Sequence, residues 1–212
     1  MYISARLFVA SLVAALPAQA SQYYDRDLRL NFQEHRTEAD ILFRVAIPAN
    51  ATAPFDVALQ VVAPVATGWA GFAWGGGMRF NPLTMVWQNG EGVTASSRAV
   101  TSYSLPRMNP NAQLTVLAGS EANETHWKAN ILCQGCSSWM EGDQNIALNA
   151  QSQNSPFAWA RSSAAPDDTS DPTSYFHYHD RRGYFDLDLR NAQNENFDQA
   201  VLNARRDRLR NI

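Results

Sequence analysis

The feature of this 212-residue sequence that most restricts its fold is a succession of short β-type segments between residues 25 and 163. Alternating apolar residues from Ile41 to Ile47 suit a half-buried strand, and the apolar run from Val57 to Val62 suits a central strand. The polar segment from Val93 to Tyr103 predicts a solvent-facing or edge strand. Many short strands without a helical middle predict an all-β antiparallel sandwich, and residues 198–210 predict a short C-terminal helix.

The chain begins with a segment that fits a secretory signal peptide. Arg6 precedes an apolar run from Leu7 to Leu16, and Ala18-Gln19-Ala20 supplies the small residues that signal peptidase requires. The run is too short for a transmembrane helix, and no later stretch is long and apolar enough to span a bilayer. We therefore expect residues 1–20 to be cleaved and residues 21–212 to form a secreted, extracellular domain.

Composition fits a single domain and gives no reason to expect nucleic acid or a membrane as a partner. The net charge is −3, and it becomes −4 when the single cation Arg6 leaves with the signal peptide. We find no internal repeat and no linker, so we expect a single domain that is monomeric. Sequons at Asn50 and Asn123 are compatible with N-glycosylation of a secreted chain.

The two cysteines lie close together, at Cys133 and Cys136. In an oxidising compartment the default interpretation of such a pair is a local disulfide. A thioredoxin-like pair needs a βαβ setting, a zinc site needs further ligands, and covalent haem attachment needs a histidine where this chain has Ser137. A disulfide that closes so small a loop is expected to stiffen a turn more than to stabilise the whole fold.

A glycine-rich bend joins two of the predicted strands. Segments 68–74 and 84–88 flank Gly75-Gly76-Gly77, and Met78 follows the last glycine directly. Consecutive glycines allow positive φ and let the backbone come close to a bulky group. Met78 is therefore either a core residue beside a tight connection or a soft ligand for something packed against the bend.

Histidines late in the chain could complete such a site. In the last predicted strand the odd-numbered residues from Phe185 to Leu189 face inward, and the same parity places His177 and His179 on the inner face. One thioether and one imidazole form a known axial pair for haem iron. Spacing alone does not establish the pair, because the two ligands would come from distant strands. His35 and His126 are predicted to be surface residues.

Segments from three parts of the chain together resemble the cytochrome domain of secreted fungal cellobiose dehydrogenases. They are the glycine–methionine segment 68–78 with Asn81-Pro82-Leu83, the Cys-Gln-Gly-Cys-Ser-Ser-Trp segment 133–139, and the His-Asp-Arg-Arg-Gly-Tyr-Phe segment 179–185. The similarity covers nearly the whole mature chain, in the same order and spacing. It implies a DOMON-type, immunoglobulin-like β-sandwich that holds one non-covalent haem b, with a disulfide between Cys133 and Cys136.

The resemblance also assigns roles to single residues. It implies Met78 and His179 as axial ligands, because the family pattern places its histidine four residues before a glycine, here Gly183. His177 is the alternative ligand. The glycines are expected to let the backbone approach the porphyrin, while Trp74 suits the hydrophobic core as well as it suits the cofactor. The residues expected to contact the haem, apart from its ligands, are Phe72, Trp74, Gly76 and Gly77.

The implied function is electron transfer. With both axial positions filled there is no open site for a substrate, so the sequence assigns no catalytic residue. By resemblance, the electron donor is a flavin-dependent dehydrogenase and the acceptor is a copper-dependent polysaccharide monooxygenase, or another acceptor, in lignocellulose oxidation. No flavin-binding motif or cellulose-binding module follows in the sequence, so we expect a stand-alone cytochrome or a truncated gene product.

Two other functions compete with electron transfer. One is a carbohydrate-binding DOMON module without a redox role. Its stacking platforms would be the surface aromatic residues Tyr23, Tyr24, Tyr103 and Tyr184. The other is a hydrolase acting through Asp167 and Asp168, which has little support, because adjacent carboxylates in a Ser/Pro-rich loop are usually solvated and no Gly-X-Ser-X-Gly motif is present.

Overall fold

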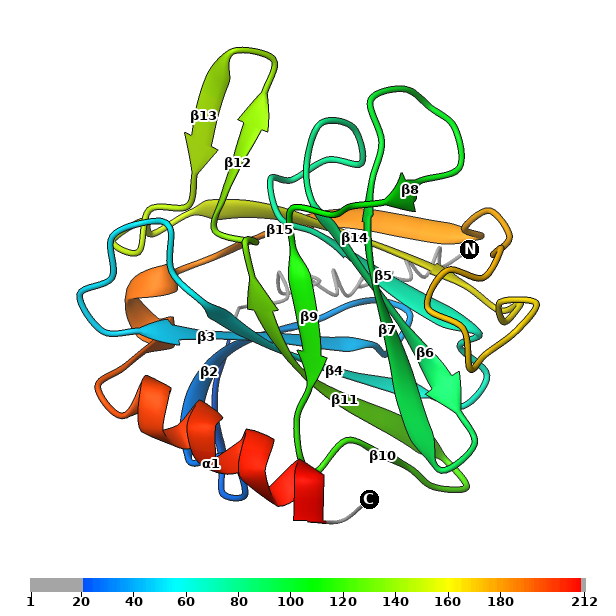
Figure 1. The fold of residues 1–212 in the computed structure, drawn as a ribbon, viewed down its shortest axis with the longest axis horizontal. Helices are drawn as coiled ribbons and strands as arrows, with labels where there is room; N and C mark the ends of the chain where they lie inside the picture. Colours follow the sequence, from blue (N-terminus) through cyan, green and yellow to red (C-terminus); the bar gives the residue numbers. More distant parts are fainter. Residues whose placement is uncertain (1–20, 211–212) are drawn as a thin grey trace, which may run out of the picture.

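The computed structural model describes residues 21–210, so the predicted signal peptide lies outside the described residues. Two sheets pack face to face, which confirms the predicted β-sandwich (Figure 1). The eight-stranded sheet contains, in spatial order, β1 (Ser21–Asp25), β2 (Leu30–Arg36), β3 (Leu42–Pro48), β4 (Val57–Pro64), β11 (His126–Gln134) and β10 (Glu121–Ala122), with β16 (Gln193–Asn194) beside β3 and β9 (Gln113–Val116) beside β11. The six-stranded sheet contains β15 (Arg181–Leu187), β14 (Ser155–Ser162), β5 (Trp69–Ala73), β6 (Leu83–Asn89), β7 (Gly92–Ala99) and β8 (Arg107–Met108).

Smaller elements complete the fold. The hairpin of β12 (Ser138–Glu141) and β13 (Gln144–Ala147) projects from one end of the sandwich (Figure 1). The 3₁₀ turn η1 (Leu189–Ala192) leads to the C-terminal helix α1 (Phe197–Arg210), which confirms the helix predicted there. Phe197 and Val201 of α1 pack with Leu30 and Phe32 of β2, so the helix covers the outer face of the eight-stranded sheet.

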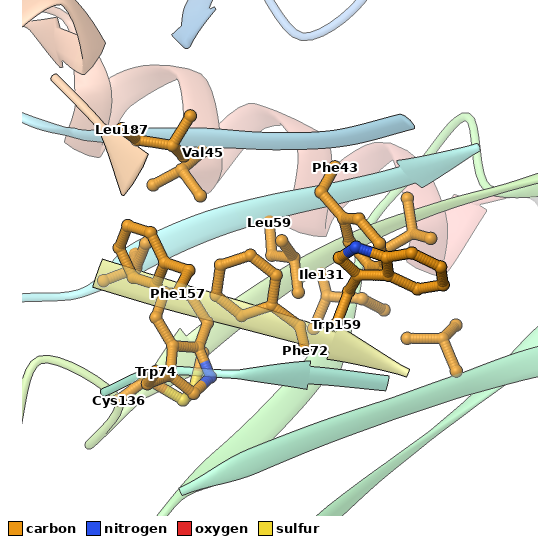
Figure 2. Packing of buried hydrophobic residues seen from close by; sticks show 14 of the residues in the cluster. Phe43, Val45, Leu59, Phe72, Trp74, Ile131, Cys136, Phe157, Trp159 and Leu187 are labelled. Atoms are coloured by element: carbon orange, nitrogen blue, oxygen red, sulfur yellow. A yellow bond between two sulfur atoms is a disulfide. The ribbon is translucent and has the colours of Figure 1, made fainter. Parts of the chain in front are cut away.

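The main core lies between the two sheets and is rich in aromatic residues (Figure 2). Phe43 and Val45 point into it from β3, as their alternation predicts, and Phe72 and Phe157 meet them from the other sheet. The ring centroids of Phe43 and Phe72 are 5.6 Å apart, and those of Phe72 and Phe157 are 5.0 Å apart. The first pair joins the two sheets, whereas the second lies within the six-stranded sheet.

The alternation of β5 and β14 divides their side chains between two faces. Phe72 and Trp74 enter the core, as do Phe157 and Trp159. The residues between them therefore face outward, and many are small: Gly71, Ala73, Ala158 and Ala160. The outer face of the six-stranded sheet therefore carries only short, apolar side chains near its centre.

The polar segment from Val93 onward is not an exposed or edge strand, contrary to the prediction. It forms β7, which pairs with both β6 and β8, and Thr94, Ser96 and Arg98 are buried. Residues 163–180, which contain no helix or strand, cross over them, and their backbone carbonyls accept hydrogen bonds from these side chains. Polar side chains on a covered sheet face are stable when they are paired in this way.

Candidate cofactor site

A cavity of about 430 Å³ lies on the outer face of the six-stranded sheet. Its floor contains the small residues of β5 and β14, and its apolar sides include Trp69, Leu83, Met85 and Phe176. Its walls come from the β5–β6 connection, from residues 103–106, and from residues 176–179 with the start of β15. An apolar pocket of this size suits a small organic ligand.

Met78 reaches the cavity from the β5–β6 connection. It is half-buried and packs against Ala73, Leu83, Val100 and Ala158. Its thioether is thus held at the cavity by contacts with two strands of the floor. Met78, at the end of the glycine bend, thus lines the cavity that the fold forms.

The glycine bend is compact because of its protein neighbours. Gly76 has a φ of 78°, and a Cβ at this position would lie 2.9 Å from Cβ of Pro156. A Cβ at Gly75 would overlap the Asn81 side chain and lie 2.8 Å from the Trp139 ring. The missing side chain of Gly75 therefore leaves space for Asn81 and Trp139, whereas Gly76 and Gly77 line the cavity.

The two candidate histidines do not lie on the inner face of a strand, which corrects the prediction. Strand β15 begins at Arg181, so His177 and His179 belong to the irregular segment before it, where strand parity does not apply. Both line the cavity, from the wall formed by residues 176–179. The segment is anchored by Trp69, whose Nε1 donates to the His177 carbonyl over 3.2 Å and whose ring meets Phe176 edge-on.

The two imidazoles have different surroundings. The His177 side chain is 56% exposed, and its Nε2 lies 3.7 Å from Oδ1 of Asp167. His179 is half-buried, and burial lowers the pKa of its imidazole; the nearby Arg182 guanidinium lowers it further, and Asp180 opposes the change. A neutral imidazole has the free lone pair that a metal ligand needs, so the environment of His179 favours the ligating form.

Of the other two histidines, His35 departs from the prediction that both lie on the surface, whereas His126 is partly exposed at the start of β11. His35 is half-buried and stacks on Phe185, with ring centroids 4.0 Å apart. Burial lowers its pKa, although Glu38 acts in the opposite direction. His126 is also half-buried and pairs with the Thr125 hydroxyl. Neither residue lines the cavity.

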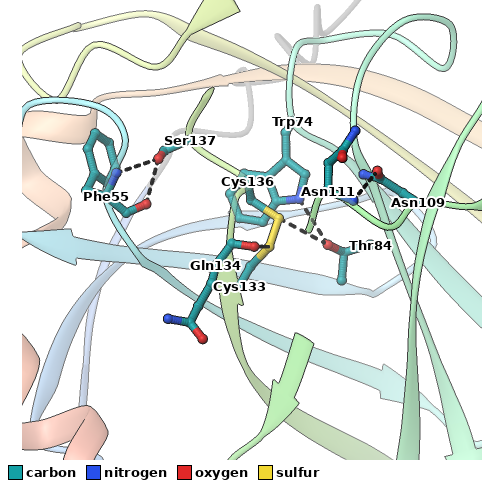
Figure 3. Close-up of a disulfide and its surroundings, with 9 residues drawn as sticks. All are labelled: Phe55, Trp74, Thr84, Asn109, Asn111, Cys133, Gln134, Cys136 and Ser137. Carbon is teal, nitrogen blue, oxygen red and sulfur yellow. Dashed lines mark hydrogen bonds between the residues drawn. A yellow bond between two sulfur atoms is a disulfide. The ribbon is translucent and has the colours of Figure 1, made fainter. Parts of the chain in front are cut away.

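Cys133 and Cys136 form the expected disulfide, which lies below the glycine bend (Figure 3). The Cys136 sulfur is 4.0 Å from Oγ1 of Thr84, and the same hydroxyl accepts a 2.9 Å hydrogen bond from Nε1 of Trp74. Trp74 precedes Gly75 directly, so the disulfide supports the start of the bend. That the disulfide stiffens this bend stays a prediction.

Cationic and aromatic side chains surround the mouth of the cavity. Arg79 and Arg182, which are distant in the sequence, both line it, and Glu141 is the acidic residue in the lining. The Arg79 guanidinium lies 4.4 Å from the ring centroid of Tyr103, which links two walls of the cavity. Tyr178 and Tyr184 also line the mouth, and both are largely exposed.

Comparison with known proteins identifies the family. A family model described as the cytochrome domain of cellobiose dehydrogenase matches residues 23–199. The chain belongs to this cytochrome family. A curated relative of the cytochrome domain is the pyrroloquinoline quinone-dependent pyranose dehydrogenase of Coprinopsis cinerea, which is 29% identical over 213 residues. The match covers 96% of this chain and 29% of the relative's length.

Solved cytochrome structures have the same fold. The cytochrome b domain of the Coprinopsis cinerea pyranose dehydrogenase superposes with a TM-score of 0.79 and 25% identity, over 88% of this chain and 96% of that chain. The cytochrome domain of Myriococcum thermophilum cellobiose dehydrogenase also gives a TM-score of 0.79, at 20% identity, over 89% and 98% of the two chains. The latter likeness shows the shared fold alone.

The lining of the cavity fits the haem b that membership in the cytochrome family implies. A macrocycle is flat and apolar and carries two carboxylates at one edge, and this cavity combines a floor of small residues with two arginines at its mouth. A thioether and an imidazole both reach the lining. The small floor residues, the two arginines, the thioether and the imidazole therefore all line this one cavity.

The cavity includes most, but not all, of the residues predicted to contact the cofactor. Met78, His179, His177, Gly76, Gly77 and Phe72 line it. Trp74 does not, because it is fully buried between the sheets and its Nε1 donates to Thr84. Sequence reasoning missed the floor, although small residues at every second position of β14 are a signal for it. It also did not place Gly183 in the lining, where a Cβ would lie 2.5 Å from Nε1 of Trp159.

Proposed function

We propose that this cytochrome domain carries single electrons through one haem b that is held by Met78 and His179. The observation that carries the proposal is that these two side chains, far apart in the sequence, line one apolar cavity in a chain of the cytochrome family. His179 is favoured over His177, since it is the less exposed of the two, whereas Nε2 of His177 lies 3.7 Å from the Asp167 carboxylate.

When bound, the haem supplies a reversible one-electron couple between ferric and ferrous iron. The Met78 thioether and the neutral His179 imidazole would hold its iron. The apolar residues that line the cavity would exclude water from the cofactor. Arg79 and Arg182 are placed to pair with its carboxylates at the mouth. We assign a carrier role and no catalytic residue.

The proposed donor is a dehydrogenase. The sequence predicts a flavin-dependent donor, and the name of the Coprinopsis cinerea relative adds a quinone-dependent dehydrogenase as a second class. The proposed acceptor is a copper-dependent polysaccharide monooxygenase, or another one-electron acceptor outside the cell. Reduction kinetics with purified dehydrogenases of both classes distinguish the two donors.

An extracellular location agrees with several surface features. No helix within residues 21–210 has the length and apolar character needed to cross a membrane. Asn50 and Asn123, the proposed glycosylation sites, are both exposed, and Asn50 lies in a turn with a positive φ. The exposure of both sequons, together with the predicted cleavage after residue 20, supports secretion of a glycosylated single domain.

Two of the four tyrosines considered for the carbohydrate-binding alternative lie at the cofactor cavity. Tyr23 is only partly exposed and lies under the Arg44 guanidinium, 3.4 Å from the ring centroid. Tyr103 and Tyr184 line the mouth of the cavity instead, on the other sheet's side. Tyr103 and Tyr184 are both exposed there, so any stacking surface that they form would coincide with the mouth of the proposed haem site.

An absorption spectrum of the purified protein tests the proposal. After expression with ample haem, we expect a Soret band that shifts on reduction and sharp α and β bands in the ferrous state. A colourless protein that also fails to take up added haem would refute the electron-transfer function. Retention on cellulose by such a colourless protein would favour the carbohydrate-binding alternative.

A further inference from the structure

The histidine-bearing segment is held in place by side chains of β7. Thr94 Oγ1 donates to the carbonyl of Thr169 over 2.7 Å, and Ser96 Oγ donates to the carbonyl of Pro172 over 2.5 Å. Residues 163–180 contain no strand or helix, so a sheet ladder does not determine their path. Hydrogen bonds from the buried face of β7 take its place.

Arg98 makes the largest share of these bonds and is 4% exposed. Its Nη2 donates to the carbonyls of Pro172 and Ser174 over 2.8 Å and 2.9 Å, and its Nε donates to the Ser96 hydroxyl over 2.6 Å. A longer bond of 3.4 Å runs from Nη1 to the carbonyl of Pro106. Pro106 and the histidine-bearing segment form different walls of the cavity, so a single guanidinium ties both walls to the sheet.

A direct line of contacts connects Arg98 with the cavity. Its guanidinium carbon lies 5.1 Å from the ring centroid of Phe176, and Phe176 meets Trp69 edge-on at 5.4 Å. Phe176 is buried and lines the cavity, and it precedes His179 by three residues. A shift of the Phe176 ring would therefore move the imidazole that we assign to the iron.

From these contacts we propose that Arg98 is a positioning residue for the histidine side of the haem site. It fixes the carbonyls of Pro172 and Ser174 and the ring of Phe176, and so holds His179 at ligand distance. Arg98 does not line the cavity, so its action is through the segment and not through contact with the cofactor. This role rests on the proposed haem function.

The test compares Arg98→Met, which keeps length but removes every donor, with Arg98→Lys, which keeps the charge but not the planar fork. Arg26→Met, at an exposed turn position, is the matched control. Low-spin fraction, haem transfer to an excess of apomyoglobin, and the effect of added imidazole are measured on haem-loaded protein. Amide hydrogen exchange of residues 169–180 is measured on the haem-free form.

We expect Arg98→Met to raise the high-spin fraction and to speed haem transfer by about tenfold or more, the effect of losing a charge-assisted hydrogen bond. Free imidazole should restore the low-spin spectrum, because the missing ligand is the histidine. Exchange in residues 169–180 should accelerate, Arg98→Lys should be intermediate, and Arg26→Met should match the wild type. If Arg98→Met does not fold, Ser96→Ala should give smaller changes in the same direction.

Two failures can be told apart. If the wild type shows no low-spin haem, the proposed function is wrong and the role of Arg98 falls with it. If the wild type is low-spin and Arg98→Met keeps its spectrum and transfer rate while exchange accelerates, Arg98 stabilises the loop without positioning the ligand. That second result would overturn the inference alone.

Discussion

The choice between two histidines that are two positions apart depends on their neighbours. His177 is exposed beside Asp167, and its backbone carbonyl accepts a hydrogen bond from Trp69 of β5. His179 is less exposed, and burial and Arg182 lower the pKa of its imidazole and so favour the neutral form. A metal ligand must be a neutral imidazole with a free nitrogen, and the Asp167 carboxylate competes for Nε2 of His177. These surroundings support the choice of His179, which the resemblance already favoured, with His177 as the alternative.

Replacing the two histidines in turn tests this choice. His179→Ala should lose the low-spin spectrum and weaken haem binding by at least about 100-fold, because even changes to residues around a metal ligand typically weaken binding 10–100-fold. His177→Ala should keep the spectrum and bind haem within about threefold of the wild type, since an exposed ion pair contributes little. The measurement is a haem titration followed at the Soret band. The reverse pattern would make His177 the ligand.

The bend between β5 and β6 presents Met78 through its glycines. Gly75 is enclosed by Asn81 and Trp139, and Gly76 needs a left-handed conformation next to Pro156. Asn81 Nδ2 also donates to the carbonyls of Gly77 and Arg79, over 3.0 Å and 3.1 Å. The glycines, which are expected to let the backbone approach the cofactor, thus also let the bend pack against the rest of the protein.

Substitution of Gly76 by alanine should damage both stability and the site. The left-handed conformation costs a non-glycine residue roughly 1–2 kcal/mol, and the added Cβ would meet Pro156. We expect a loss of unfolding free energy of at least this size in urea, and a larger high-spin fraction because Met78 is displaced. Gly90→Ala is the control, since Gly90 has a φ of 59° but a Cβ added there would meet no atom within 4 Å.

The two outcomes of the glycine experiment separate strain from ligand placement. Gly90→Ala should lose only the conformational part of the stability and keep the wild-type spectrum. If Gly76→Ala also keeps the wild-type spectrum, the bend does not determine where Met78 lies.

The molecule as a whole covers the outer faces of its two sheets in different ways. Helix α1 covers one face with Phe197 and Val201, whereas an irregular segment covers the other and leaves the cavity. At the edge between the sheets, His35 of β2 stacks on Phe185 of β15. The strand that follows the proposed ligand is therefore connected to the opposite sheet through a half-buried imidazole.

Burial of His35 makes the stability of the haem-free protein depend on pH. Its pKa is lowered in the folded state, so the unfolded chain binds the proton first as the pH falls through the ordinary histidine value of about 6.5. The contribution of His35 is therefore fully present above that pH and is lost below it. Urea unfolding of the haem-free protein should show lower stability at pH 5 than at pH 7, and a smaller difference in His35→Phe. An unchanged difference in the variant would exclude His35 as a source.

Sequence reasoning predicted those parts of the molecule that depend on local patterns. The alternation of β3, the glycine bend with Met78, and the cysteine pair are all local, and the resemblance supplied the family. It failed where distant segments decide. Segment 93–103 looked exposed because its partners, the carbonyls of residues 169–174, lie far away in the sequence. The parity of β15 could not extend to His179, because the ladder begins only at Arg181.

The pairing of Met78 with His179 on one haem iron is tested most directly by the ferrous absorption spectrum of Met78→Ala beside that of the wild type. We predict sharp α and β bands for the wild type and their loss in the variant, with haem still bound, since the histidine and the apolar floor remain. Wild-type α and β bands in Met78→Ala would show that the sixth ligand comes from elsewhere and would contradict the proposed site.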